Sequence, residues 1–452
     1  MAADMSCSSY NNSNRSQSDL KAYRASIIHS IGDPSEVEKG ASYDYFPDGL
    51  LIVERGKIRA VGHANDLLPS YEQTLEIIHY EEALITPGFV DTHIHYPQLE
   101  IVGSHGEQLL EWLEKYVFLA EGRFDESGHA EDVARRFLAE LLRNGTTTAL
   151  VFGSVHKESV DAFFQVAAEL GLRMIAGKVL MDSNAPDWLR DTVESGYKDS
   201  LELIQRWHGK HRLSYAVTPR FAITCSREQL KSAGRLLTEH PGVYLHTHLS
   251  ENKAEIESVA HLFPERTGYL DVYAHYGLVG PRSIFAHGIH LTEHECAHLG
   301  HAGAAVAFCP SSNLFLGSGL LDLARLEKHK VHVGLATDIG AGTSFSLLHT
   351  CNEAYKVLQL QGHKLDPFKA LYLATLGGAR ALRLDDKIGN FSIGKEADFA
   401  VLDYKATPLL DYRIGGANKI EEKLFVLMML GDDRCVKETF AEGRSVYRRA
   451  GS

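Results

Sequence analysis

The chain has 452 residues, 46 of them basic and 59 acidic, which gives a net charge of −13 at neutral pH. This balance argues against binding to nucleic acid or anionic membranes, because both need a basic surface, and we expect no such partner. No apolar run approaches the ~18 residues of a membrane span. The length suits a (β/α)₈ barrel of roughly 250 residues together with a smaller domain.

The two ends of the chain have a different texture from its middle. Residues 1–20 are rich in Ser and Asn, lack the apolar segment of a signal peptide, and are predicted to form a disordered tail. Short strand-like segments separated by turn residues occupy residues 21–85 and return in residues 385–450. The two stretches predict one small β-sandwich built from both ends of the chain.

Residues 86–384 alternate between helical and strand patterns. Apolar residues recur at helical spacing in 130–145, and the strand-like "TTTALVF" follows. Ser226 and Gln229 form a capping-box pattern before a helix, while Asp366 and Pro367 predict the N-cap and first position of another. Such alternation implies a parallel α/β fold, and we predict a (β/α)₈ barrel because it fits the length better than two open sheets.

Cysteines are scattered through the chain. None of the six forms a Cys-x-x-Cys pair, which favours reduced thiols and a cytoplasmic setting. Cytidine-type deaminases hold zinc through a P-C-x-x-C signature, so the sequence excludes that class.

Polar side chains stand at the predicted carboxyl ends of several barrel strands, where barrel enzymes build their active sites. They are His93, His95, His248, His287 and Asp338. Imidazole nitrogens and one carboxylate suit Zn²⁺ or Fe²⁺, and a catalytic site leaves one position open for water. A single histidine on an apolar strand is commonly a core residue, so the predicted metal site depends on all five together.

The neighbours of these residues leave alternatives open. Strand alternation puts His246 on the same face as His248, and spacing alone does not choose between them. Glu251 is placed to act as general acid and base, but it also suits the first turn of a helix. Asp91 shares a strand face with His93 and is a candidate for orienting a metal ligand.

Longer segments resemble a known family. The order "GFVDTHIH", "HTHLSE", "AHG" and "TD" resembles the amidohydrolase superfamily in its mononuclear deaminase branch. More narrowly, "HYPQ", "LLEWLEKYVF", "NGTTTA", "TPRF" and "FCPSSNLFLGSGL" are similar to the guanine deaminase family. The resembling segments run from about residue 85 to 434, and the β-rich ends resemble the superfamily's composite sandwich.

The resemblance implies hydrolytic deamination of guanine to xanthine and ammonia by a metal-activated water, in a homodimer with one Zn²⁺ per subunit. Fe²⁺ remains an alternative, because the same ligand types suit both ions. The implied metal ligands are His93, His95, His248 and Asp338. The implied catalytic residues are Glu251, His287 and Asp338, with His287 beside the water and not on the metal.

The implied purine contacts are Gln98, Arg220 and Phe221, joined by His95, His248, Glu251 and Asp338. A guanidinium donates hydrogen bonds to a carbonyl such as guanine O6 and cannot accept one, so Arg220 would disfavour adenine. Taken alone, Arg220 fits a surface ion pair and Gln98 a polar loop. Trp112 and Phe118 are interpreted mainly as packing residues.

Three other functions remain open. A related deaminase or chlorohydrolase of the same branch would act on another purine or a triazine. A binuclear cyclic-amide hydrolase would need a carboxylated lysine at a strand end, for which Lys178 is the candidate. A scaffold without catalysis would keep the fold but would be expected to lose metal ligands.

Overall fold

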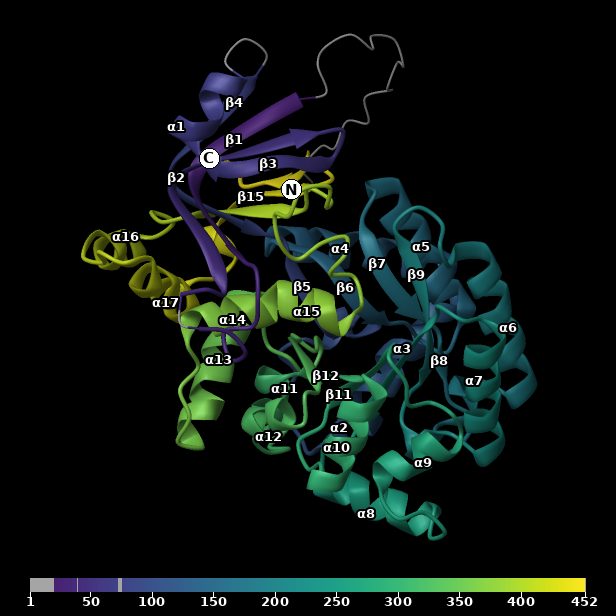
Figure 1. Ribbon diagram of the computed structural model, residues 1–452. Coiled ribbons are helices and arrows are strands. Elements are labelled where there is room, and N and C mark those ends of the chain that lie inside the picture. The colour runs from purple at the N-terminus through teal and green to yellow at the C-terminus, as the bar shows by residue number, and fades with distance from the viewer. Residues whose placement is uncertain (1–19, 39, 72–74, 452) are drawn as a thin grey trace.

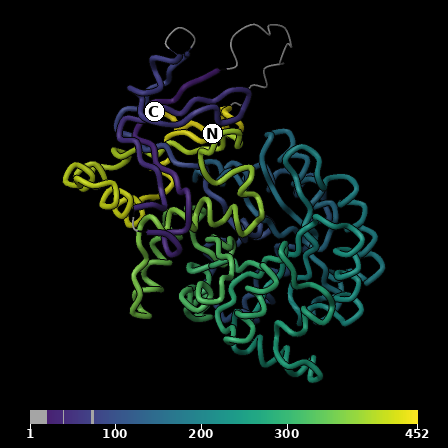
Figure 2. Tube along the Cα trace, viewed as in Figure 1, coloured from purple at the N-terminus to yellow at the C-terminus, as the bar shows by residue number. Residues whose placement is uncertain are grey.

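The computed structural model describes residues 20–38, 40–71 and 75–451, so the predicted tail, apart from Leu20, lies outside the described residues. Figure 1 shows a barrel wrapped by helices, with a smaller β-sheet above it that contains both purple and yellow strands. Figure 2 traces the chain from that sheet through the barrel and back to the sheet.

The smaller sheet joins strands from both ends of the chain in the order β16-β15-β14-β4-β1-β2-β3. Neighbouring strands are antiparallel except β1 and β4, which are parallel. The strands are β1 (Leu20–Ser30), β2 (Tyr43–Glu54), β3 (Lys57–His63), β4 (Glu76–Pro87), β14 (Phe399–Asp403), β15 (Val436–Ala441) and β16 (Arg444–Arg448). The Phe399 ring lies 4.9 Å from that of Tyr23 and 4.3 Å from that of Phe440, so the two chain ends share one aromatic core.

The barrel strands are parallel and follow the order β5-β6-β7-β9-β10-β11-β12-β13, with the short β8 paired to β9. They are β5 (Phe89–His95), β6 (Thr146–Phe152), β7 (Arg173–Gly177), β8 (Val179–Leu180), β9 (Leu213–Pro219), β10 (Tyr244–Leu249), β11 (Ser283–His287), β12 (Ala305–Phe308) and β13 (His332–Leu335). Hydrogen bonds between β5 and the segment after β13 join the two ends of the barrel sheet. Asp338 N donates to His93 O at 3.0 Å, and His95 N donates to Ile339 O at 2.8 Å. The predicted fold, a barrel with a smaller β-domain from both chain ends, is confirmed.

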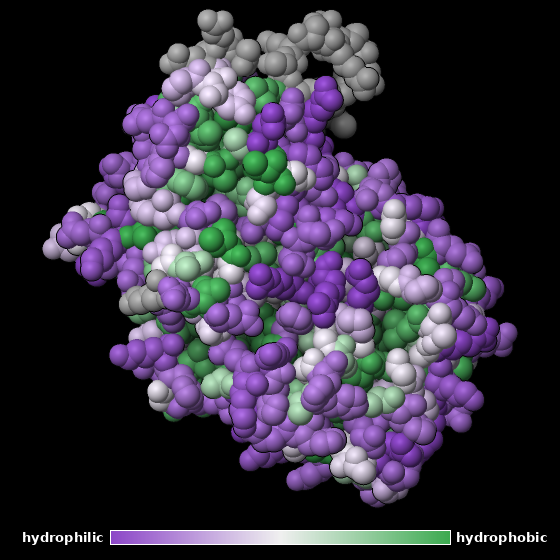
Figure 3. All heavy atoms as spheres, in the orientation of Figure 1, coloured by the Kyte–Doolittle hydropathy of each residue, from purple (hydrophilic) through white to green (hydrophobic). Residues whose placement is uncertain are grey.

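Helices cover the outside of the barrel and one side of the small sheet (Figure 1). They are α1 (Ala64–Leu67), α2 (Leu109–Trp112), α3 (Phe118–Glu121), α4 (Ser127–Arg143), α5 (Lys157–Leu170), α6 (Val193–Trp207), α7 (Arg227–Glu239), α8 (Lys253–Leu262), α9 (Tyr269–His275), α10 (Glu293–Ala302), α11 (Pro310–Phe315), α12 (Leu323–Lys328), α13 (Leu347–Leu360), α14 (Pro367–Ala374), α15 (Leu376–Ala381), α16 (Pro408–Gly415) and α17 (Ile420–Leu430). Within the described ranges, none of them is both long and apolar enough to cross a membrane. Hydrophilic residues cover most of the face in Figure 3, with hydrophobic ones in small groups.

The predicted helix starts are mostly correct. Asp366 caps α14 by accepting from Phe368 N, with Pro367 at the first position. Ser226 caps α7 by accepting from Gln229 N at 3.1 Å. The reciprocal half of the predicted capping box is wrong, because the Gln229 side chain donates to Asp191 instead. A partner 38 residues away in sequence is invisible to a local pattern.

The barrel interior is packed in layers that leave polar side chains at one end. Tyr244 belongs to an inner apolar cluster that takes a residue from each of the strands β5, β6, β7, β9, β10, β11 and β12. Since every second residue of a strand faces the same way, His246 and His248 continue the inward face of Tyr244 towards the carboxyl end. The apolar layer therefore forms a floor beneath a histidine-lined site.

A buried ionic network joins the small sheet to the amino-terminal end of the barrel. Arg173 Nη2 lies 2.5 Å from Glu396 Oε1, and Arg212 Nη2 lies 2.6 Å from Glu396 Oε2. Arg212 also pairs with Asp398, which directly precedes β14. The network lies away from the carboxyl ends of the strands, so it fixes the two units together without entering the site.

Candidate active site

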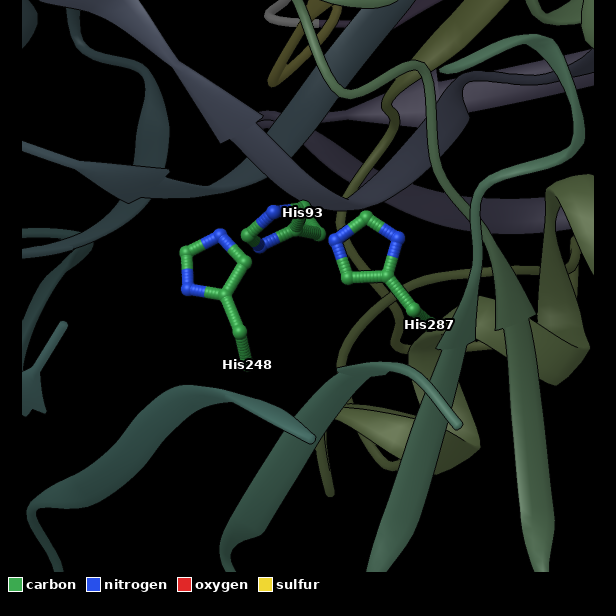
Figure 4. A group of neighbouring side chains, drawn as sticks. All are labelled: His93, His248 and His287. Carbon is green, nitrogen blue, oxygen red and sulfur yellow. The ribbon is translucent and has the colours of Figure 1, made fainter. Parts of the chain in front are cut away.

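The five polar residues predicted at strand ends meet at the carboxyl end of the barrel. His93 and His95 lie in β5, His248 in β10 and His287 at the end of β11, while Asp338 follows β13. Figure 4 shows the rings of His93, His248 and His287 facing one another. The side chains of His93, His95, His287 and Asp338 are buried, and that of His248 is partly buried.

Four of their atoms have the spacing of a metal coordination shell. His93 Nε2 and His95 Nε2 are 3.2 Å apart, and His248 Nε2 is 3.3 Å from His95 Nε2. Asp338 Oδ1 lies 3.2 Å from His93 Nε2 and 3.4 Å from His95 Nε2. A tetrahedron with bonds of 2.0–2.1 Å to its centre has edges of about 3.3–3.4 Å, which these four distances match, and three imidazoles with one carboxylate suit an ion such as Zn²⁺.

The opposite ring nitrogens of His93 and His248 are held so that their Nε2 atoms face this centre, whereas His95 Nδ1 has no hydrogen-bond partner among the described groups. His248 Nδ1 lies 2.7 Å from the Arg220 carbonyl, which can only accept, so the ring proton is on Nδ1. His93 Nδ1 lies 2.7 Å from His246 Nε2. Burial lowers the pKa of His93, His95 and His248 well below the usual value, which keeps the rings neutral, the state that binds metal.

His246, Asp91 and Lys178 stand behind the cluster or away from it. His246 contacts His93 and not the centre, which distinguishes it from His248. Asp91 accepts from His93 N at 3.3 Å and from Thr337 N at 3.1 Å, so it fixes the two backbone segments that carry His93 and Asp338. Lys178 Nζ is bound to Asp191 Oδ2 at 2.6 Å.

His287 and Glu251 face each other beside the cluster. His287 Nε2 lies 3.4 Å from Glu251 Oε2 and 3.8 Å from Asp338 Oδ2, and no described group hydrogen-bonds to this nitrogen. His287 Nδ1 contacts Asn313 Oδ1 at 2.8 Å, and the amide oxygen accepts the ring proton. His287 therefore presents its Nε2 between two carboxylates.

Glu251 is a buried carboxyl with a perturbed acidity. Burial, followed by the nearby Asp338 charge, raises the pKa of Glu251 to about 8, while a hydrogen bond from Ser318 opposes the rise. Ser318 Oγ donates to Glu251 Oε1 at 3.3 Å, and Glu255 accepts from Glu251 N at 2.8 Å. Such a group holds a proton near neutral pH and can release it to a base, as a general acid requires.

The backbone at the site is strained. His287, Asp338 and Ser250 adopt positive φ angles of 71°, 52° and 51°, in the left-handed region that non-glycine residues rarely occupy. Each such residue costs of order 1–3 kcal/mol and persists only when the surroundings hold it. The strain falls at the turns that aim the site residues, which is its usual place in enzymes.

A cavity beside the cluster brings in the predicted purine contacts. Its walls contain Gln98, Arg220 and Phe221 together with five residues described above, and apolar side chains including Trp112 complete it. The five are His95, His248, Glu251, His287 and Asp338. Trp112, interpreted from sequence mainly as packing, therefore borders the cavity, whereas Phe118 packs 5.7 Å from the Arg220 guanidinium carbon.

Sequence reasoning missed three polar residues that hold the site: Glu121, Asn313 and Ser318. Glu121 is fully buried and contacts both Gln98 and Arg220. Glu121 ends a helical stretch whose middle, Leu113–Val117, is a π-helical turn, a feature frequent at functional sites. Phe118 and Phe124, three residues to either side, are buried, so helical spacing already places Glu121 on an apolar face.

Comparison with known proteins identifies the family of the chain. Residues 84–446 match the amidohydrolase family, and the protein belongs to that family. Within it, the chain is 53% identical to the guanine deaminase of Escherichia coli, over 95% of this chain and 98% of that one. The solved structure of E. coli guanine deaminase matches with a TM-score of 0.92 at 52% identity, covering 95% of this chain and all of that one. A guanine deaminase from C. acetobutylicum, solved with guanine in its active site, matches with a TM-score of 0.86 at 28% identity, covering 95% of this chain and all of that one.

Proposed function

We propose that the protein is a guanine deaminase, a hydrolase that cleaves the bond between C2 and the amino nitrogen of guanine to give xanthine and ammonia. The observation that carries this function is a single cavity whose wall contains His95, His248 and Asp338 of the metal cluster together with the polar side chains of Gln98 and Arg220. The similarity to guanine deaminases along 95% of the chain supports it.

We assign one Zn²⁺ to His93, His95, His248 and Asp338, because their donor atoms have tetrahedral spacing. When bound, the ion acts as a Lewis acid that lowers the pKa of water towards ~7. The binuclear alternative lacks support, because Lys178 is paired with Asp191 instead of standing beside the cluster. Metal analysis of the purified protein tests the assignment: we expect one equivalent of zinc, and two equivalents would contradict it.

Three residues carry out the proton transfers. Asp338 and His287 remove a proton from the attacking water and direct its oxygen to C2, while Glu251 donates a proton to ring nitrogen N3. His287 Nε2 stands between the Asp338 and Glu251 carboxylates, so the proton taken from water can reach the departing amine through Glu251. C2 becomes tetrahedral, the bond to the amino nitrogen breaks as ammonia leaves, and the proton of the new C2 hydroxyl returns to Glu251 as the C2 carbonyl of xanthine forms.

The substrate is bound by residues of the cavity wall opposite the metal cluster. Arg220 offers guanidinium N–H groups to O6, Gln98 borders the same edge of the base, and Phe221 bounds the ring. Because Arg220 donates and cannot accept, a 6-amino purine such as adenine is disfavoured.

A substrate panel tests the proposal against its nearest rivals. Zinc-loaded protein is offered guanine, adenine, an oxidised purine and a chlorotriazine, and ammonia or chloride release is measured. We expect kcat/KM to be highest for guanine. A higher kcat/KM for the triazine or the oxidised purine would assign the protein to another member of its branch.

We further propose a homodimer in the cytoplasm, with residues 21–85 and 385–450 as one domain and 86–384 as the other. The dimer rests on resemblance alone, and light scattering of the purified protein tests it. The five described cysteines are free and buried, which supports a reducing compartment. Cell fractionation checks the location.

A further inference from the structure

Glu121 is a buried carboxylate with no role in the proton transfers above. Its side chain is fully shielded from solvent at the end of α3. Oε1 accepts a hydrogen bond from Gln98 Nε2 at 3.0 Å, and Oε2 accepts one from Arg220 Nη1 at 2.7 Å. One carboxylate therefore holds both polar side chains that we assign to purine binding.

The contact with Glu121 fixes which end of the Gln98 amide faces which way. A carboxylate only accepts, so the Gln98 NH₂ group must face Glu121. On its other side, Gln98 Oε1 accepts from Gly340 N at 3.3 Å, which demands an oxygen there. The contacts with Glu121 and with Gly340 N therefore require the same orientation of the amide. In this orientation one amide N–H of Gln98 remains for a ligand in the cavity that Gln98 lines.

The same carboxylate fixes the Arg220 guanidinium. Arg220 is buried, and the helical stretch that ends at Glu121 also supplies the Phe118 ring, 5.7 Å from the guanidinium carbon. The hydrogen bond to the carboxylate and the contact with the Phe118 ring together hold the guanidinium in place. The Arg220 backbone carbonyl meanwhile holds His248, so the orientation of this residue relates the base site to the metal cluster.

We propose that Glu121 is a specificity-determining residue that positions Gln98 and Arg220 to read the 6-oxo edge of a purine. The inference rests on the proposed function and deepens it. Glu121 accepts one N–H of each side chain and so directs the remaining N–H groups at the cavity. There an acceptor such as O6 can take their hydrogen bonds, whereas a 6-amino group, which is a donor, cannot.

The test compares hypoxanthine with purine, which differ at position 6 and lack the 2-amino group that is hydrolysed. Their dissociation constants for the zinc-loaded protein are measured by titration calorimetry. In the wild type we expect hypoxanthine to bind at least about tenfold more tightly than purine, because an unmet buried donor is costly. In Glu121→Gln we expect hypoxanthine binding to weaken about tenfold or more, with purine binding nearly unchanged.

Two further variants separate positioning from folding. Glu111→Gln, an exposed glutamate on the same helical stretch, is the matched control and should keep the wild-type ratio. Glu121→Asp keeps the charge that balances Arg220 but is one methylene too short to hold both partners, so the ratio should fall while the melting temperature changes little. If Glu121→Gln does not fold, the hypoxanthine-to-purine ratio of Glu121→Asp tests the inference.

An unchanged hypoxanthine-to-purine ratio in either folded Glu121 variant, or no such preference in the wild type, overturns the inference. Because neither ligand is turned over at C2, the result does not depend on catalysis. Protein that prefers hypoxanthine but does not hydrolyse guanine would overturn the proposed function alone. Guanine turnover with an unchanged ratio would overturn only the role of Glu121.

Discussion

Replacing His246 with alanine should weaken metal binding although His246 does not face the metal centre. His246 Nε2 lies 2.7 Å from His93 Nδ1. When His93 Nε2 binds a metal, the ring proton of His93 is on Nδ1, and its donation to His246 Nε2 keeps the lone pair of His93 Nε2 directed at the centre. The His246 ring is fully buried, with its centroid 4.3 Å from that of Phe152. The substitution therefore removes a hydrogen-bond acceptor and leaves a small cavity.

The size of the effect follows from these contacts. Loss of a partner behind a metal-bound histidine costs about 10–100-fold in metal affinity, which corresponds to about 1.4–2.7 kcal/mol. The cavity lowers the free energy of unfolding of the metal-free protein by about 3 kcal/mol. His246→Gln places an amide oxygen near the position of Nε2, so it should recover most of the zinc affinity.

Zinc affinity is measured by competition with a chromogenic chelator, and thermal unfolding of the metal-free variants reports the cavity term separately. His294→Ala, which removes an exposed imidazole from α10, serves as the control. Folded His246→Ala that binds zinc as tightly as the wild type would refute the reasoning.

Three further substitutions follow from the same geometry. Glu251→Gln should keep zinc and lose about 10²–10⁴-fold in kcat, measured by steady-state kinetics with metal analysis, and retained turnover would contradict its proton-transfer role. Asn313→Ala frees the His287 ring and should lower kcat more than it raises KM; the opposite split would show that Asn313 acts on binding. Glu396→Gln should cost about 3 kcal/mol or more in denaturant unfolding, because it leaves buried arginines unpaired, and an unchanged midpoint would refute this. Burial alone would raise the pKa of Glu396, but the Arg173 hydrogen bond and both arginine charges outweigh it and lower the pKa to about 2. A carboxylate with a lowered folded pKa stabilises above its ordinary value near 4.5 and loses that stabilisation as pH falls towards 2, so the variant should show a weaker loss of stability in this range.

The metal cluster could be predicted because its members carry strong local signals. Each of His93, His95 and His248 lies on a strand whose inward face is set by alternation, and His287 and Asp338 stand where strands end. Parallel strands in a barrel bring those ends together, so proximity followed from the fold class. The choice of His248 over His246 did not follow, because both face inward and only their depth in the barrel separates them.

Of the supporting residues, only Glu121 carried a usable local signal. Glu121 contacts partners 23 and 99 residues away, and in sequence it is one more glutamate in a helical stretch. Its flanking buried phenylalanines were a usable signal, since a charged residue on an apolar helix face needs a buried partner. Asn313 and Ser318 lie in the segment after β12, where no periodicity indicates which side chains turn towards His287 and Glu251.

The central claim is that one zinc at His93, His95, His248 and Asp338 supports hydrolysis of guanine at C2. Its most direct test is product analysis with zinc-loaded protein of counted metal content, in which chromatography measures xanthine and a coupled assay measures ammonia. The account predicts that guanine disappears with equal amounts of xanthine and ammonia formed, by protein holding one zinc per chain. Folded protein with one zinc that leaves guanine unchanged would contradict it.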